Sequence, residues 1–329
     1  MITDKQQVYE QLHAQGIISD ASFGKINEQR LNPLFSIHWE IKTILYLGIM
    51  LLTGGIGVLV YQNIDTIGHQ IILLFIALVS GGCLFYCFKN KKPFSRSKVE
   101  SPNTFFDYIL LLGTISLLIF VGYLQYQYNV FGSNYGLATL IPMLALFYLA
   151  YNFDHVGILN MAIANLGVWM GVTATPRHLL QAGTFDNQSA VFTYLSFGLL
   201  LLLGAWLTQK FVFKKHFTFS YGHYGIHVTI IALLAGYFHY YDEGHAILWL
   251  IAVIALTVAI YRNAYKQKSF YFLLLSILYG YFAVSCLLFY ILSAGINDGA
   301  IILYFYFIPV SAAVVIYQLN RLHKKLKAS

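Results

Sequence analysis

The chain is poor in charged residues, proline and cysteine. Only 10% of its 329 residues are charged, six are proline and three are cysteine. Soluble domains carry about 25% charged residues, so this composition excludes an ordinary soluble enzyme. Three cysteines are too few for a disulfide-stapled secreted scaffold, and the lack of repeating tracts excludes collagen and low-complexity disorder.

Apolar residues make up 58% of the chain and aromatic residues 17%. A transmembrane helix needs about 20 apolar residues to cross a hydrocarbon core roughly 30 Å thick. The pattern predicts an all-α integral membrane protein with about ten transmembrane helices. The apolar runs lie at about 43–61, 69–88, 105–127, 135–151, 156–174, 189–209, 224–241, 246–261, 269–293 and 300–318.

Basic residues fall in alternate connections between these runs. With a cytoplasmic N-terminus, all of the 20 Lys and Arg residues except Arg177 lie in inner segments. Short loops rich in Lys and Arg stay on the cytoplasmic side, so the pattern predicts that both termini are cytoplasmic. The outer loops carry acidic residues instead, namely Asp65, Asp186, Asp242, Glu243 and Asp298.

Three regions are expected. Residues 1–40 form a cytoplasmic amphipathic helical hairpin, residues 41–320 a ten-helix transmembrane domain, and residues 321–329 a basic cytoplasmic tail. The first residues lack a basic-then-apolar run with a small-residue cleavage site, so no cleaved signal peptide is expected. The hairpin is predicted to rest on the membrane surface or to dock a protein partner.

The net charge of +7 is explained by topology and by contact with anionic lipid headgroups, so nucleic acid is not an expected partner. The densest basic cluster comprises Lys89, Lys91, Lys92, Arg96 and Lys98. We favour an ordinary topology signal for this cluster. The alternative is that it holds a specific anionic lipid.

Polar residues in or near the apolar runs are the candidate functional positions. His239, Asp242, Glu243 and His245 cluster at the outer end of the seventh run, where imidazole and carboxylate could bind a metal. A short hydrated loop is the favoured interpretation. His227 lies about one turn inside the inner end of the same run, where an ionisable group is a functional hypothesis.

Asn160 and Asn165 stand in the fifth run beside small residues, including the Gly167–Gly171 GxxxG spacing. Close helix packing is the default interpretation, with amides bonding across the interface; lining of a substrate path is the alternative. Asp107 and Asp154 are the acidic residues nearest to the runs, at inner ends. The middle of each span lacks carboxylate, lysine and arginine, which disfavours ion-coupled transport and carboxylate-based hydrolysis.

The N-terminal segment LHAQGIISDASFGKINEQ, then His38-Trp39-Glu40, precedes a glycine-rich helix, LYLGIMLLTGGIGVLVYQN, ending at Asn63-Ile64-Asp65. These features resemble the domain of unknown function 2157 family of bacterial membrane proteins, most clearly over residues 10–90. Asn63 and Asp65 are candidate positions on this resemblance. The resemblance implies a multi-pass protein of the bacterial inner membrane, and it brings no established activity or cofactor.

The leading functional prediction is a non-enzymatic membrane-embedded subunit that supports an envelope complex, with a possible protein partner bound through residues 1–40. One alternative is a transporter-like conduit for a lipid or a neutral small solute. A second alternative is an outward-facing metal-assisted enzyme at His239–His245. No GxSxG elbow is present, so an enzyme is disfavoured, and no cofactor is expected.

Overall fold

A computed structural model describes residues 12–13, 15–20, 22–24, 38–62, 68–132, 135–174, 188–294 and 298–328. Within these residues every regular element is helical. The chain divides into two units, Met1–Tyr61 and Gln62–Ser329. Candidate residues Asn63 and Asp65 lie outside the described residues.

The first unit contains one long helix, α3 (His38–Gln62), whose apolar side chains are largely exposed. Before it, residues 12–13 and 22–24 are helical, and a turn lies between them. Gly16 adopts a φ of 71° in this turn, a conformation that glycine reaches without steric cost. The remainder of the predicted hairpin lies outside the described residues.

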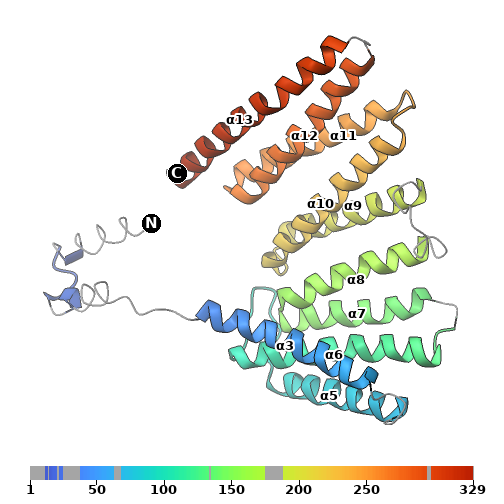
Figure 1. Ribbon diagram of the computed structural model, residues 1–329. Coiled ribbons are helices and arrows are strands. Elements are labelled where there is room, and N and C mark those ends of the chain that lie inside the picture. Colours follow the sequence, from blue (N-terminus) through green and yellow to red (C-terminus); the bar gives the residue numbers. More distant parts are fainter. Residues whose placement is uncertain are drawn as a thin grey trace. The chain divides into compact units, whose positions relative to one another are not determined.

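The second unit is a series of helices in which each one packs against the next in sequence (Figure 1). The tightest neighbours are α5 with α6, α7 with α8, α9 with α10, and α11 with α12. The helices of this unit are α5 (His69–Asn90), α6 (Thr104–Tyr128), α7 (Tyr135–Phe153), α8 (Val156–Ala174), α9 (Gln188–Lys210), α10 (Thr218–His239), α11 (Ala246–Lys266), α12 (Phe270–Ala294) and α13 (Asp298–Ala328).

Seven helices of the described residues are long and apolar enough to cross a membrane. They are α3, α5, α6, α7, α9, α11 and α12. Each of the ten predicted apolar runs overlaps one of the ten long helices found among the described residues. The helices therefore lie where hydropathy places them, and the protein has several helices of membrane-spanning character.

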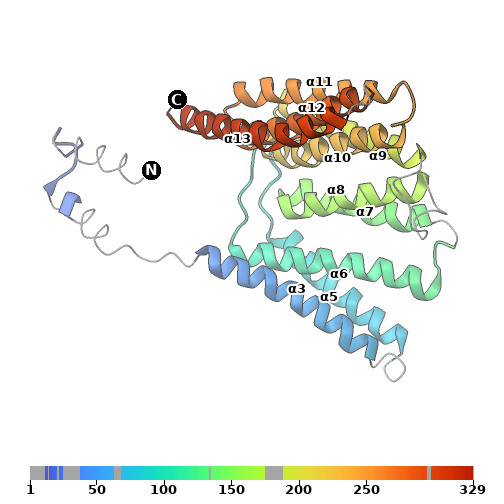
Figure 2. The same cartoon turned by 45° about the horizontal axis from the view of Figure 1, so that its top comes forward.

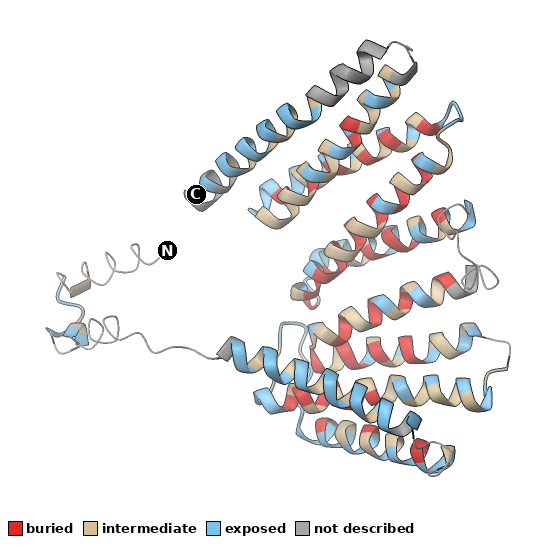
Figure 3. Cartoon of the chain, viewed as in Figure 1, coloured by how far each residue is buried: buried red, intermediate tan, exposed pale blue. Residues whose placement is uncertain are grey.

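Buried residues lie along the helices from α5 to α12 (Figure 3). They form two main hydrophobic clusters. The larger group joins α5 to α10 and includes the fully buried Leu110, Leu146, Leu159 and Ile163. The smaller group joins α10, α11 and α12 around Ile230, Val253 and Ala283. Many outward-facing side chains are large and apolar, as expected where lipid replaces water around the helices.

Three connectors of the second unit lie at one end, here called the basic end: 91–103 between α5 and α6, 154–155 between α7 and α8, and 211–217 between α9 and α10. The first carries Lys91, Lys92, Arg96 and Lys98, and the third carries Lys214 and Lys215. The connector 91–103 does not take the shortest path from α5 to α6. Figure 2 shows this connector reaching past the ends of α7 and α8 toward α9 and α10. It therefore brings residues of the α5–α6 pair to the middle of the unit.

Helices α9 and α10 pack closely at Gly198 of α9. A Cβ atom there would lie 2.3 Å from Thr229 Oγ1 and 2.6 Å from Thr229 N on α10. Backbone cannot yield as a side-chain tip can, so we expect Gly198→Ala to lower the unfolding free energy by about 1–3 kcal/mol or more. Unfolding titrations in mixed micelles measure this effect.

The matched control is Gly82→Ala on α5, where a new Cβ would meet no atom within 4 Å. This variant should unfold like the wild type or slightly later, because alanine has the higher helix propensity. Equal stability of the Gly198→Ala protein and the wild type would show that α9 and α10 do not cross this closely.

Candidate functional site

A buried ion pair joins the connectors at the basic end. Lys214 Nζ lies 2.9 Å from Asp154 Oδ2, and each side chain is 1% exposed. His216 Nε2 lies 2.6 Å from the other carboxylate oxygen, Oδ1. Asp154 thus faces two basic side chains that follow α9, about 60 residues later in the chain.

Local backbone geometry places these side chains. Asp154 ends α7 with a φ of 59°, and Lys214 has a φ of 50°. Aspartate tolerates this left-handed conformation better than most residues. His155 N donates to Ala150 O, and Ile158 N donates to the ring of His155, so the turn closes α7 and caps α8 at once. The Asp154 carboxylate is thereby fixed at the end of the helix pair.

The α5–α6 connector is fastened to this ion pair by its backbone. Lys214 N donates to Arg96 O over 2.8 Å, and Val99 N donates to the Asp154 carboxylate over 2.5 Å. Lys214 Nζ also lies 4.8 Å from the centre of the Phe94 ring, a cation–π distance. The position of Arg96 is therefore set by Asp154 and Lys214.

His216 is the second basic side chain beside Asp154. Burial lowers the pKa of His216 below its usual value, whereas the nearby Asp154 charge raises it and the Lys214 charge lowers it further. The net shift is downward, so burial in this cluster favours the neutral form of His216.

A cleft opens beside this cluster, between α7 and α9. Its volume is about 730 Å³, within the range of small-molecule sites. Leu200 and Leu203 line it and are about half exposed, so the cleft opens to the surroundings of the unit. Its walls are mostly apolar: Phe147, Tyr151, Leu166, Leu200, Leu203, Gly204, Leu207, Thr208, Phe211, Phe213 and Tyr221.

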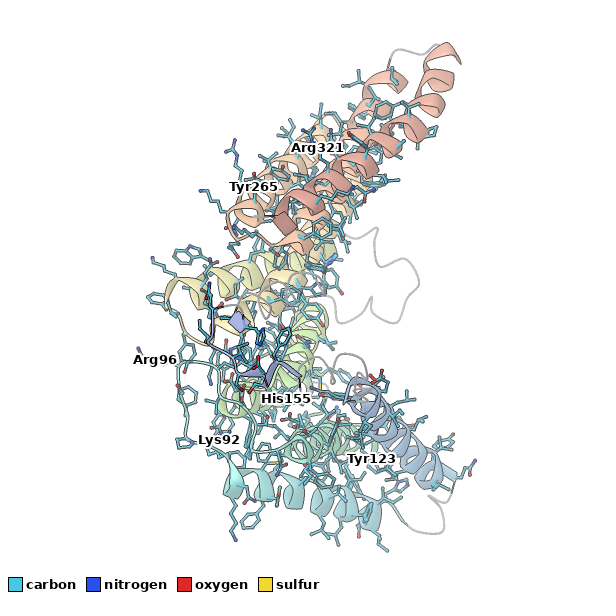
Figure 4. All side chains as sticks on the ribbon, turned by 90° about the vertical axis from the view of Figure 1, so that its left-hand side faces the viewer. Lys92, Arg96, Tyr123, His155, Tyr265 and Arg321 are labelled. Atoms are coloured by element: carbon cyan, nitrogen blue, oxygen red, sulfur yellow. The ribbon has the colours of Figure 1, made fainter. Side chains whose placement is uncertain are left out.

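Polar groups of the cleft gather toward the basic end. Arg96 is its one charged lining residue, and Figure 4 shows Arg96 and Lys92 along the same connector. Tyr151 OH and Tyr221 OH lie 2.9 Å apart. One hydroxyl donates to the other, which leaves one O–H of the pair able to donate elsewhere. The nine residues of α9 from Leu200 to Thr208 span about 12 Å along the helix axis, and most of those that line the cleft are apolar.

The sequence-predicted outer cluster lies in the turn between α10 and α11. His245 Nε2 is 3.1 Å from Glu243 Oε2, and both side chains are at least half exposed. The structure brings these two together, and across the described part of the chain it shows no group of three or more His, Cys, Asp or Glu side chains placed to hold a metal ion. Asp242 is exposed in this turn, and His239 is the last residue of α10.

Asn160 and Asn165 lie on α8 and do not line the cleft. Their Oδ1 atoms are buried and have no hydrogen-bond partner among the described residues. The side-chain oxygens of Asn160 and Asn165 therefore do not accept the hydrogen bonds that were predicted across a helix interface. His227, by contrast, is hydrogen-bonded to tyrosines of α12.

From the sequence, Asp154 is expected near the interface, and Arg96 belongs to the basic cluster whose alternative interpretation is a site for an anionic lipid. No role is predicted for Lys214 or His216. The sequence around Lys214 does not predict that it is buried, so it looks like one more basic residue of an inner loop. A usable signal is Asp154 itself, an isolated carboxylate at an inner helix end among basic connectors. Such a carboxylate favours a cationic partner.

Residues 10–159 match the sequence model of the family described as predicted membrane protein (DUF2157). The match confirms the predicted resemblance and extends it past residue 90. Curated proteins and solved structures give no match to the chain. The protein is thus similar to a family of membrane proteins of unknown function, and the matched residues include Arg96 and Asp154 but not α9 or α10.

Proposed function

We propose that the chain is a polytopic protein of the bacterial inner membrane that binds one amphiphile with a negatively charged headgroup in the cleft between α7 and α9. The observation that carries this proposal is the cleft itself, whose apolar wall ends at a single cation, Arg96. An acyl chain fits the apolar length, and the headgroup meets the guanidinium at the basic end.

The predicted topology supports the same assignment. With ten spans and both termini cytoplasmic, the basic end faces the cytoplasm, where the leaflet is rich in anionic lipids. The cleft opens laterally through Leu200 and Leu203, so a lipid can enter from the bilayer. This favours a protein that holds or conducts a lipid over a purely supporting subunit. Docking of a protein partner through residues 1–40 stays a prediction.

Arg96→Gln tests the headgroup contact. The wild-type protein, purified in a gentle detergent and equilibrated with phosphatidylcholine vesicles containing phosphatidylglycerol, should retain phosphatidylglycerol. A hydrogen bond to a charged group contributes about 1.5–3 kcal/mol, so the variant should retain about ten-fold less. Mass spectrometry of the co-purifying lipids measures the amount.

Lys92→Gln is the control, because Lys92 is an exposed cation of the same connector that does not line the cleft. It should retain lipid like the wild type. Equal loss in both variants would indicate general attraction of anionic lipid to the basic end, and equal retention by Arg96→Gln and the wild type would refute the assigned contact.

A further inference from the structure

Two histidines of α10 face two tyrosines of α12. His223 and His227 are one turn apart on one helix face, and their ring centres lie 4.8 Å apart. His223 Nδ1 is hydrogen-bonded to Tyr271 OH. His227 Nε2 lies 3.4 Å from that same hydroxyl, and His227 Nδ1 lies 2.6 Å from Tyr279 OH.

These contacts form one continuous chain of hydrogen bonds, called the hydrogen-bond chain or, below, simply the chain. Tyr271 OH stands between the two imidazoles, and His227 uses both ring nitrogens, one toward each tyrosine. A neutral imidazole has one donor and one acceptor nitrogen, and a phenol both donates and accepts. The chain can therefore be fully hydrogen-bonded in two opposite directions, with every proton pointing toward His223 or every proton pointing toward Tyr279.

We propose that His223, Tyr271, His227 and Tyr279 form a proton relay between the basic end of the second unit and its interior. In one step, a proton binds His223 Nε2 and the proton on His223 Nδ1 passes to Tyr271. The Tyr271 proton passes to His227 Nε2, the proton on His227 Nδ1 passes to Tyr279, and a water molecule at the interior end accepts the proton that Tyr279 held. One proton enters and one departs, so the chain reverses direction without a net change in charge.

The position of the chain fits this role. Tyr271 is the second residue of α12, and Tyr279 lies eight residues further, about 12 Å along the axis. The entry side is near the start of α10, where Phe219 packs against Tyr271 at 5.4 Å between ring centres. In a bilayer, ionisable groups at such depth are costly and are kept where a proton path needs them.

The alternative is a purely structural role, in which these hydrogen bonds only hold α10 and α12 together like a staple. The two roles predict opposite effects of removing the Tyr271 hydroxyl. If the chain is a staple, removing Tyr271 OH loosens the helix pair and lets water reach His227 sooner. If it is a relay, the same change removes the path by which His227 exchanges protons with the basic end, so exchange slows.

Tyr271→Phe in the full-length protein decides between them. The protein is labelled with ¹⁵N-histidine, and the His227 signal is assigned by its loss in a His227→Gln variant. NMR then measures the rate at which the His227 ring N–H proton exchanges with water. We expect exchange to slow about ten-fold, equivalent to about 1.4 kcal/mol in the barrier. Unchanged or faster exchange would overturn the relay. His223→Gln breaks the chain at its entry and should also slow exchange, which keeps the test open if Tyr271→Phe fails to fold.

Tyr281→Phe is the matched control. Tyr281 is on α12 but is hydrogen-bonded to Ile308 O and Ser311 of α13, away from the histidines. Its loss should leave His227 exchange unchanged, and slowing there would also count against the relay. The relay stands apart from lipid binding in the cleft, because none of its four members lines that cleft.

Discussion

Asp154→Asn should destabilise this protein strongly. It leaves the Lys214 ammonium, 1% exposed, without its 2.9 Å carboxylate partner. Breaking a buried ion pair on one side costs about 3–5 kcal/mol, because an uncompensated charge stays buried. Asparagine has nearly the shape of aspartate and tolerates the φ of 59°, so the loss reflects charge. Unfolding in mixed micelles measures it.

Two further variants complete this test. Asp154→Asn combined with Lys214→Met removes both charges and should recover most of the loss, since an apolar replacement of a buried ion pair is often neutral. Asp242→Asn changes an exposed carboxylate in the turn after α10 and should shift stability by no more than about 0.5 kcal/mol. A double variant as unstable as Asp154→Asn would show that the carboxylate acts through Val99 N and not through Lys214.

The helices could be predicted because hydropathy marks the membrane-crossing length directly. The structure differs mainly at helix ends. α10 begins at Thr218, where the predicted run starts at about 224, and α13 continues to Ala328, where the run stops at about 318. Polar residues extend a helix beyond the hydrocarbon region without changing its apolar length, so a pattern of hydropathy cannot locate such ends.

The candidate site could be predicted only in part. Asp154 and His227 stand out because ionisable residues near apolar runs are rare. Their partners are not visible in the same way: Lys214 is 60 residues from Asp154, and Tyr279 is 52 residues from His227. Tyrosine is so frequent here, with 26 copies, that no pattern separates a hydrogen-bonded tyrosine from an interfacial one. These partners are identified only once the structure shows which distant helices and connectors lie side by side.

The route of the α5–α6 connector was the least predictable feature. Its basic residues fit a topology signal, and that explanation needs no fixed structure. In the structure, Lys91 Nζ donates to Asn152 Oδ1 over 2.9 Å, and Arg96 O accepts from Lys214 N. A segment that keeps a helix end cytoplasmic can therefore also place one cation at a cleft. The proposal that Arg96 binds a headgroup is therefore compatible with the prediction that the other basic residues act as a topology signal.

Leu203→Trp should prevent a lipid from binding in the cleft. Leu203 lines the cleft from α9 and is 53% exposed, so a larger side chain can occupy the space without entering the core. The indole would take volume that an acyl chain needs, and bound phosphatidylglycerol should fall about ten-fold, or about 1.4 kcal/mol. The retained lipid is measured by mass spectrometry after equilibration with the vesicles used for Arg96→Gln.

Leu199→Trp provides the comparison that makes this result specific. Leu199 is on the same helix and 51% exposed, but it does not line the cleft. Both variants add the same apolar surface to α9, so general effects on folding or on the detergent micelle should be equal. Loss of lipid in Leu203→Trp alone assigns the acyl chain to the cleft. If Leu203→Trp retains lipid while Arg96→Gln loses it, the headgroup is bound at the basic end and the chain lies outside the cleft, along the surface of the helices.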